Sequence, residues 1–251
     1  MYKYNIMKYL VIYRGKIGRF QDLELLYNNF INKIHNPLII NNNSVDIILT
    51  SYDNESYIMD KYKDKFKPID THIMKYNNST QVDNFIFVLS TLKNYYENYD
   101  RILILRYDIC YKKNIMSWDI YNKKGIFFPY KEDSKELFKN HNYVSDTIIL
   151  IDKEYFIPLF NTLNDIYPLH ISKTPILLNG HLQYPFLYTI LHDIKSILEY
   201  KNINIPINFL IEGYFQSNTE IPLNDIRLSP LYIMMHKNYY NNDTYMLYDH
   251  N

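Results

Sequence analysis

The stretch Tyr99–Lys113, YDRILILRYDICYKK, decides how the chain is expected to fold. Its apolar run Ile102–Leu105 is short, contains only isoleucine and leucine, and is flanked by charge, which is typical of a strand buried on both faces. Arg106 and Asp108 follow the run and are expected where that strand emerges. Ligands of open α/β sheets bind at the carboxyl ends of the strands, so this pair marks a candidate site.

Two interpretations of Arg106 and Asp108 are open at this point. Residues i and i+2 of a strand point to the same face, so the two side chains could form an ion pair. Alternatively, Asp108 faces a metal-bound or polar ligand, because an ionised carboxylate is very costly to bury alone. The spacing by itself slightly favours the ion pair.

The first half of the chain alternates between apolar runs that predict strands and amphipathic segments that predict helices. Strands are expected at Lys8–Tyr13, Val45–Leu49, Pro68–Met74 and Ile102–Leu105, and helices at Phe20–Ile34, Ser56–Phe66 and Gln81–Asn98. Asn36-Pro37 is expected to end the first helix, and Thr80 is expected to cap the third. This alternation predicts an α/β fold with a mostly parallel sheet and helices on its faces.

The second half is less regular. Strands are expected at Gly125–Tyr130, Ile148–Ile151 and Ile205–Ile211, and helices at Lys153–Leu163 and His181–Tyr200. Asp152 is a candidate cap for the first of these helices, and Lys131–Asn142 is expected to be a surface loop or short helix.

The composition limits the class of protein. A chain of 251 residues can bury roughly three quarters of its unfolded surface, so we expect one domain over residues 1–251. A net charge of +0 argues against a nucleic-acid partner, which would require a basic face. The single Cys110 excludes an intrachain disulfide and a cysteine-based zinc site. Because neither a membrane-spanning run nor a signal-peptide pattern is found, we expect a cytoplasmic protein.

Two common nucleotide-binding motifs are missing from the sequence. The first expected strand is followed by RGKIGRF, which is neither the G-x-G-x-x-G fingerprint of dinucleotide-binding folds nor the Walker A pattern. A nucleotide bound by this sheet would therefore be held without a glycine cradle.

The layout resembles that of glycosyltransferases with the GT-A fold. The segment Arg106-Tyr107-Asp108 after its strand is similar to an R-x-D variant of the D-x-D motif of those enzymes. The segments Tyr214, Ser217-Asn218-Thr219 and Pro230-Leu231-Tyr232 are similar to the tail of transferase-like proteins from large DNA viruses and algae. The resemblance implies a nucleotide-binding half at 1–113 and a less regular acceptor half at 114–251.

The resemblance also implies a set of donor-binding residues around the ends of the strands. These are Arg14, Arg19, Ser51, Tyr52, Asp53, Gln81, Asn84, Arg106 and Asp108. The alternatives without a binding role are a solvated turn for Arg14 and Arg19, a helix cap for Asp53, and surface positions for Gln81 and Asn84.

A divalent metal is the expected cofactor of such a site. A D-x-D motif offers two carboxylates to Mn²⁺ or Mg²⁺, but here Arg106 replaces the first acid. Either Asp108 holds the metal, helped by His236, or Arg106 offsets the diphosphate charge directly. A histidine next to an apolar run can also be purely structural.

Asp146 is the candidate catalytic base. An inverting transferase needs a carboxylate to take the proton of the acceptor hydroxyl, whereas a retaining enzyme does not need this base. The alternative for Asp146 is an acid at the edge of a strand.

The expected activity is transfer of a sugar from a nucleotide-diphosphate sugar to a glycan or protein hydroxyl. One alternative is a non-catalytic nucleotide-sugar-binding or scaffold protein on the same fold, motivated by the missing acid. A weaker one is a nucleotidyltransferase, which usually carries a glycine-rich phosphate loop; here only Gly15 and Gly18 lie in that region.

Overall fold

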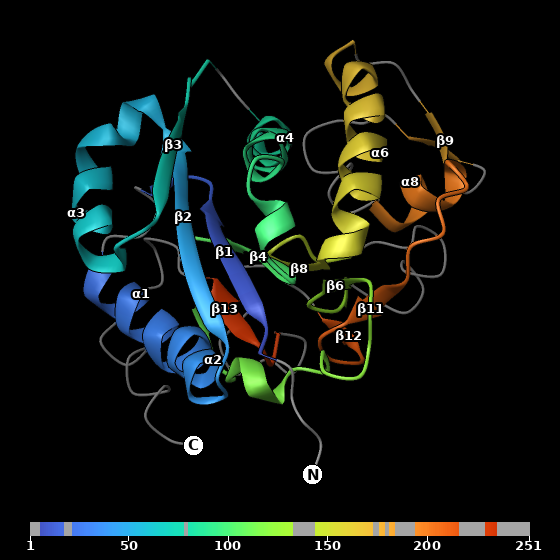
Figure 1. Cartoon of the computed structure of the whole chain (residues 1–251). Coiled ribbons are helices and arrows are strands. Elements are labelled where there is room, and N and C mark those ends of the chain that lie inside the picture. The colour runs from blue at the N-terminus through green and yellow to red at the C-terminus, as the bar shows by residue number, and fades with distance from the viewer. Residues whose placement is uncertain are drawn as a thin grey trace.

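The computed structural model describes residues 6–17, 22–77, 80–132, 144–172, 176–178, 181–183, 194–215 and 229–234. A central sheet of seven strands runs through this part of the chain, in the order β11-β6-β8-β4-β1-β2-β3 (Figure 1). Its strands are β1 (Lys8–Arg14), β2 (Ser44–Tyr52), β3 (Asp70–Met74), β4 (Arg101–Arg106), β6 (Ile126–Phe128), β8 (Ile148–Asp152) and β11 (Ile207–Phe209). Within this sheet β8 runs against both of its neighbours, and the other pairings are parallel. The prediction of a mostly parallel α/β sheet is confirmed.

Helices cover both faces of the sheet (Figure 1). One face carries α1 (Leu23–Phe30), the π-helical turn η2 (Ile31–His35), α2 (Asn36–Ile40) and α3 (Ser56–Phe66). The other carries α4 (Gln81–Leu92), α6 (Lys153–Ile171) and α8 (Ile194–Tyr200). The central strands are buried on both sides, which explains their continuous apolar runs.

The alternation along β1 decides which layer its last residue enters. Tyr9, Val11 and Tyr13 pack in the core under α1 and α3, whereas Leu10 and Ile12 pack under α4 and α6. Arg14 continues the second series. Its guanidinium lies 5.5 Å from the ring centroid of Phe85 in α4.

Smaller strand pairs complete the described structure. They are β5 (Ile109–Tyr111) with β13 (Tyr232–Met234), β9 (Ile176–Leu178) with β10 (His181–Gln183), and β7 (Lys131–Glu132) with β12 (Tyr214–Phe215). The short turns η3 (Asp53–Glu55), η4 (Tyr96–Asn98) and η5 (Ile115–Ser117) join larger elements.

The first predicted helix does not end at Asn36-Pro37. It passes through η2, in which the amide of Asn36 donates to the carbonyl of Ile31, and continues as α2 to Ile40. Pro37 sits in the first turn of α2, where its lack of an N–H group is tolerated. The prediction that this proline stops the helix was therefore wrong.

Other boundary predictions were also wrong, among them the end of the helix predicted at Lys153–Leu163, because α6 continues to Ile171. His181–Gln183 forms a strand, and the described helix in the predicted range His181–Tyr200 is α8 alone. α4 ends at Leu92. Asp152 does not cap α6, because its carboxylate accepts hydrogen bonds from Arg101 Nε at 2.7 Å and from the amide of Gly125 at 2.8 Å. Most of Lys131–Asn142 lies outside the described residues.

Thr80 caps α4 as predicted. Its hydroxyl accepts the amide of Asp83 at 3.2 Å, and the Asp83 carboxylate accepts the amide of Thr80, which is a reciprocal capping box. We expect Thr80→Ala to lower the free energy of unfolding by about 1 kcal/mol in urea titrations. Thr80→Ser keeps the hydroxyl and serves as the control, so equal losses in the two variants would contradict the capping role.

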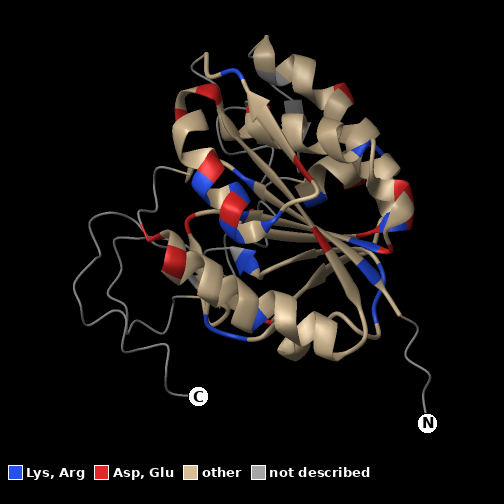
Figure 2. Cartoon of the chain, turned by 60° about the vertical axis from the view of Figure 1, so that its left-hand side comes forward, with Lys and Arg blue, Asp and Glu red and all other residues tan. Residues whose placement is uncertain are grey.

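The surface carries charges of both signs. Figure 2 shows lysine and arginine interspersed with aspartate and glutamate over the helices and loops, in keeping with the net charge of +0. Within the described residues, no helix combines the length and hydropathy needed to cross a membrane.

Candidate functional site

The carboxyl ends of the central parallel strands meet at one edge of the sheet. Arg14 at the end of β1 is the register partner of Arg106 at the end of β4. β8 runs in the opposite direction and starts at this edge, where Ile148 pairs with Leu105. Asp146, two residues before β8, is thereby brought to both arginines.

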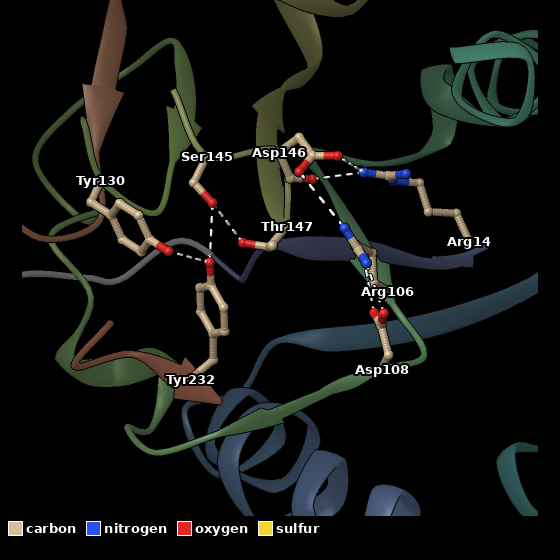
Figure 3. A network of polar contacts seen from close by, with 8 residues as sticks. All are labelled: Arg14, Arg106, Asp108, Tyr130, Ser145, Asp146, Thr147 and Tyr232. Carbon is tan, nitrogen blue, oxygen red and sulfur yellow. Dashed lines mark hydrogen bonds and ion pairs between the residues drawn. The ribbon is translucent and has the colours of Figure 1, made fainter. Parts of the chain in front are cut away.

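Arg14, Arg106, Asp108 and Asp146 form a buried ion-pair group, here called the arginine–aspartate cluster (Figure 3). Arg14 Nη2 donates to the backbone oxygen of Asp146 at 2.7 Å and to its Oδ2 at 2.8 Å. Arg106 binds Asp108 through two parallel hydrogen bonds, Nε to Oδ1 at 2.9 Å and Nη2 to Oδ2 at 2.7 Å. Its Nη1 lies 3.8 Å from Asp146 Oδ1. The ion pair expected from the i, i+2 spacing is confirmed.

The two arginines are not equally compensated. All four residues of the cluster are at most 8% exposed. Burial lowers the pKa of Arg14, and the opposing effect of Asp146 does not fully offset it. Burial also acts to lower the pKa of Arg106, but the charges of Asp108 and Asp146 outweigh it and the pKa rises. Arg14 is therefore the arginine that would gain more from an additional anionic or hydrogen-bond-accepting partner.

Arg14 and Asn84 both carry buried polar atoms without a hydrogen-bond partner in the described structure, and the one on Arg14 supports this asymmetry. Within the described part of the chain, Arg14 Nε has no hydrogen-bond partner, and neither amide atom of Asn84 has one. Asn84 is 1% exposed and lies in the first turns of α4, where it directly precedes Phe85, the residue whose ring Arg14 approaches. Each buried donor or acceptor left unpaired costs about 1–3 kcal/mol, so these groups suit a ligand with complementary atoms.

A second polar group, here called the hydroxyl chain, consists of Tyr130, Tyr232, Ser145 and Thr147 (Figure 3). The hydroxyls of Tyr130 and Tyr232 are 2.5 Å apart, and Tyr232 Oη is 3.1 Å from Ser145 Oγ. Ser145 Oγ lies 2.9 Å from Thr147 Oγ1. Ser145 and Thr147 flank Asp146 in the sequence, so the two groups share one backbone segment.

The end of β2 lies at the same edge but is tied to its own surroundings. Ser51 donates to Glu55 Oε2 at 2.8 Å, and the same oxygen accepts the amide of Ile17 at 2.9 Å. Asp53 accepts the amide of Tyr76 at 2.9 Å and does not cap η3. Both side chains thus organise the loops around the site.

Tyr52 lies beside the arginine–aspartate cluster. Burial raises its pKa to about 12, and the positive charge of Arg14 acts against this rise. Its ring meets the Tyr76 ring edge-on at 5.3 Å. The hydroxyl of Tyr52 is therefore neutral at physiological pH and can serve as a hydrogen-bonding group.

The other predicted residues are distributed as follows. Gln81 is the first residue of α4, one turn before Asn84, at the same edge of the sheet as the end of β3. Arg19 and His236 lie outside the described residues. The structure thus brings Arg14, Arg106, Asp108 and Asp146 together and places Tyr52 beside them.

The described residues do not fit a metal site. No group of three or more histidine, cysteine, aspartate or glutamate side chains gathers in the described ranges. The carboxylates of Asp108 and Asp146 both face guanidinium groups, which occupy the oxygens that a cation would need. We therefore derive no step through a metal.

Sequence reasoning missed Glu55 and the hydroxyl chain. Ser145-Asp146-Thr147 is a polar triplet directly before an apolar strand, and this pattern could have pointed to all three residues. Tyr130 and Tyr232 carry no such signal, since the chain has 28 tyrosines.

Comparisons with known proteins bear on the fold. The structure resembles 4-diphosphocytidyl-2C-methyl-D-erythritol synthase from Anaerococcus prevotii, with 10% identity, a TM-score of 0.51, and coverage of 83% of this chain and 89% of that one. The fold is GT-A-like. The inositol-1-phosphate CTP transferase from T. maritima is also similar (10% identity, TM-score 0.48, 96% and 94% covered). So is a Drosophila β1,4-galactosyltransferase 7 in complex with manganese, UDP-Gal and xylobiose (11% identity, TM-score 0.46, 98% and 81% covered). No protein-family model and no curated protein sequence matches the chain.

Proposed function

We propose that the chain is a glycosyltransferase that binds a nucleotide-diphosphate sugar at the carboxyl edge of the sheet. The observation that carries this proposal is the buried Arg14, whose Nε has no partner in the described structure and whose single carboxylate partner is shared with Arg106. A phosphate oxygen of the donor would complete its hydrogen bonding. The position at the strand ends of a GT-A-like sheet supports the assignment.

Arg14 is the proposed contact of the diphosphate. A guanidinium presents a planar set of donors that matches phosphate, and charge-assisted hydrogen bonds of this kind are the strong ones. As the bond between the sugar and the diphosphate breaks, negative charge grows on the leaving group. A buried, fixed guanidinium stabilises that charge without reorganisation. Arg106 already donates two hydrogen bonds to Asp108. It would therefore stabilise the leaving group through its positive charge and not through direct hydrogen bonds.

Asn84 is the proposed contact of another polar part of the donor. Its amide offers a donor and an acceptor side by side, which suits a nucleobase edge or a sugar hydroxyl. Tyr52 and Gln81 lie at the same edge of the sheet and would line the same region. The roles of Arg19, Ser51 and Asp53 in donor binding stay predictions.

In the proposed reaction the acceptor hydroxyl oxygen attacks the anomeric carbon. The bond from that carbon to the diphosphate oxygen breaks with its electron pair, and the acceptor proton passes to a base. Asp146 remains the candidate base, although its carboxylate already accepts a hydrogen bond from Arg14. The acceptor would be a glycan or protein hydroxyl bound by the second half.

Asp146→Asn separates the two roles of that residue. As a base, Asp146 is needed only for transfer, so the variant would bind donor normally and lose turnover. As a holder of Arg14, it is needed for binding, so donor affinity would fall as well. We expect the second result, measured by calorimetric titration of donor alongside turnover.

Two alternatives have specific support. The balanced charge of the arginine–aspartate cluster favours a non-catalytic nucleotide-sugar-binding or scaffold protein, because every formal charge in it is matched. The similarity in fold to the 4-diphosphocytidyl-2C-methyl-D-erythritol synthase motivates a nucleotidyltransferase as the other alternative. Such an enzyme would consume a nucleoside triphosphate and release pyrophosphate.

A product assay distinguishes the three. The chain is incubated with UDP-, GDP-, CMP- and dTDP-sugars, with and without Mn²⁺, and separately with nucleoside triphosphates plus sugar phosphates. Slow release of sugar to water, with the nucleotide as the second product, supports the glycosyltransferase. Pyrophosphate release indicates the nucleotidyltransferase, and no product in either arm indicates the scaffold. A requirement for Mn²⁺ would show that a metal joins the site.

A further inference from the structure

The last described segment returns to the candidate site from far along the chain. β13 pairs antiparallel with β5, which starts directly after Asp108, and Tyr232 is the register partner of Tyr111. The carbonyl of Leu231 accepts the amide of Lys112 at 2.7 Å, and the carbonyl of Ser229 accepts Lys112 Nζ at 2.9 Å. Tyr232 is only 2% exposed.

The hydroxyl of Tyr232 joins two parts of the site edge. On one side it meets Tyr130, which follows β6, and on the other it meets Ser145, which precedes Asp146 (Figure 3). The amide of Ser145 also donates to the carbonyl of Tyr130 at 3.2 Å. The three segments are therefore held as one unit next to the arginine–aspartate cluster.

We propose that Tyr232 is a positioning residue for the donor site, which acts through Ser145 on Asp146 and thereby on Arg14. The Tyr232 hydroxyl also lies close enough to Arg106 to act on it directly, so Arg14 is the arginine that reports the indirect effect. This inference rests on the proposed function for its effect on donor binding. Its structural part is independent of that function, because it concerns how the guanidinium groups are held.

The proposed positioning effect depends on the hydroxyl group of Tyr232. Ser145 Oγ contacts only Tyr232 and Thr147 among the hydrogen bonds described for it, so loss of the Tyr232 hydroxyl interrupts the hydroxyl chain and leaves Ser145 with Thr147 alone. The backbone at Asp146 then loses a lateral support, while the ion pairs themselves keep all their atoms. A general loss of packing would behave differently, because the aromatic ring remains in Tyr232→Phe.

Tyr111→Phe is a matched control. Tyr111 is also fully buried and lies opposite Tyr232 in the same strand pair. Its hydroxyl has no well-aligned hydrogen-bond partner among the described residues; it faces the hydroxyl of Tyr13 and does not touch the hydroxyl chain. The two substitutions remove the same atom from neighbouring positions, and only one of them touches the hydroxyl chain.

The test measures the NMR signals of the arginine side chains. The chain has five arginines, so the Nε–Hε signals in a two-dimensional NMR spectrum can be assigned by single Arg→Lys variants. We expect Tyr232→Phe to shift and broaden the Arg14 and Arg106 signals and to weaken donor binding about fivefold. Tyr111→Phe should leave the signals and the affinity unchanged. Ser145→Ala, which breaks the next link, should reproduce the effect if Tyr232→Phe does not fold.

Each outcome decides the inference. An unchanged Arg14 signal in both Tyr232→Phe and Ser145→Ala would overturn the inference, as would an equal effect on the Arg14 signal in Tyr111→Phe. Wild-type protein that binds no nucleotide-sugar would overturn the proposed function. The arginine signals would still decide whether Tyr232 positions the cluster.

Discussion

Asp108→Ala is expected to lower the free energy of unfolding by about 3–5 kcal/mol, because it leaves the buried Arg106 without its bidentate partner. The other carboxylate near Arg106, on Asp146, is 3.8 Å away and already engages Arg14. The Asp146 carboxylate can therefore compensate only part of the buried positive charge of Arg106 that Asp108→Ala leaves unpaired. Urea denaturation followed by circular dichroism measures the loss.

The double variant Arg106→Met/Asp108→Ala is the control for this prediction. It removes the charge together with its partner, and replacing a complete buried pair with apolar groups is often close to neutral. We therefore expect it to recover most of the stability lost in Asp108→Ala. A single variant as stable as wild type, or a double variant less stable than the single one, would contradict the account.

This result changes how activity data on Asp108 are interpreted. The R-x-D resemblance predicts that Asp108→Ala abolishes turnover while folding stays intact. The structure makes the aspartate a structural partner as well, so lost activity in this variant alone does not identify a metal ligand. Activity has to be compared with the folded fraction of each variant.

Arg14→Lys is expected to weaken donor binding by about tenfold to a hundredfold. A hydrogen bond to a charged group contributes about 1.5–3 kcal/mol, and lysine keeps the positive charge but lacks the Nε donor and the planar fork. Asp146 retains a cationic neighbour, so the fold should tolerate the change. Isothermal titration with the preferred nucleotide-sugar measures the affinity.

Arg101→Lys provides the matched control. Arg101 is as buried as Arg14 and is likewise paired with one aspartate, Asp152, but it lies at the opposite end of β4. The substitution should affect stability without changing donor affinity. Equal donor affinities for Arg14→Lys, Arg101→Lys and wild type would remove Arg14 from the proposed site.

Much of the fold could be predicted because its signals are local. The apolar run Ile102–Leu105 lies inside β4, and the periodic segment Ser56–Phe66 has the bounds of α3. Asn36-Pro37 misled the prediction because a proline in the first turn of a new helix is tolerated, and sequence does not show that a π-helical turn precedes it.

The candidate site was predictable only where its contacts are short-range. Arg106 and Asp108 are two residues apart, at the end of β4 and in the turn that follows it, so their ion pair is a local contact. Arg14 and Asp146 are separated by 132 positions, and their contact depends on β8 running against β4. Tyr232 reaches the site through the pairing of β13 with β5. This pairing joins segments far apart in the sequence, so no local sequence pattern predicts it.

The most direct test of a donor site at this edge is the thermal unfolding midpoint of the wild-type chain with UDP-, GDP-, CMP- and dTDP-sugars. A ligand that binds only the folded state, at about 100 times its Kd, adds about 2.7 kcal/mol to the free energy of unfolding. We expect sugars of one nucleotide to raise the midpoint in the wild type and in Arg101→Lys but much less in Arg14→Lys. No shift with any nucleotide-sugar, or the same shift in Arg14→Lys, would contradict it.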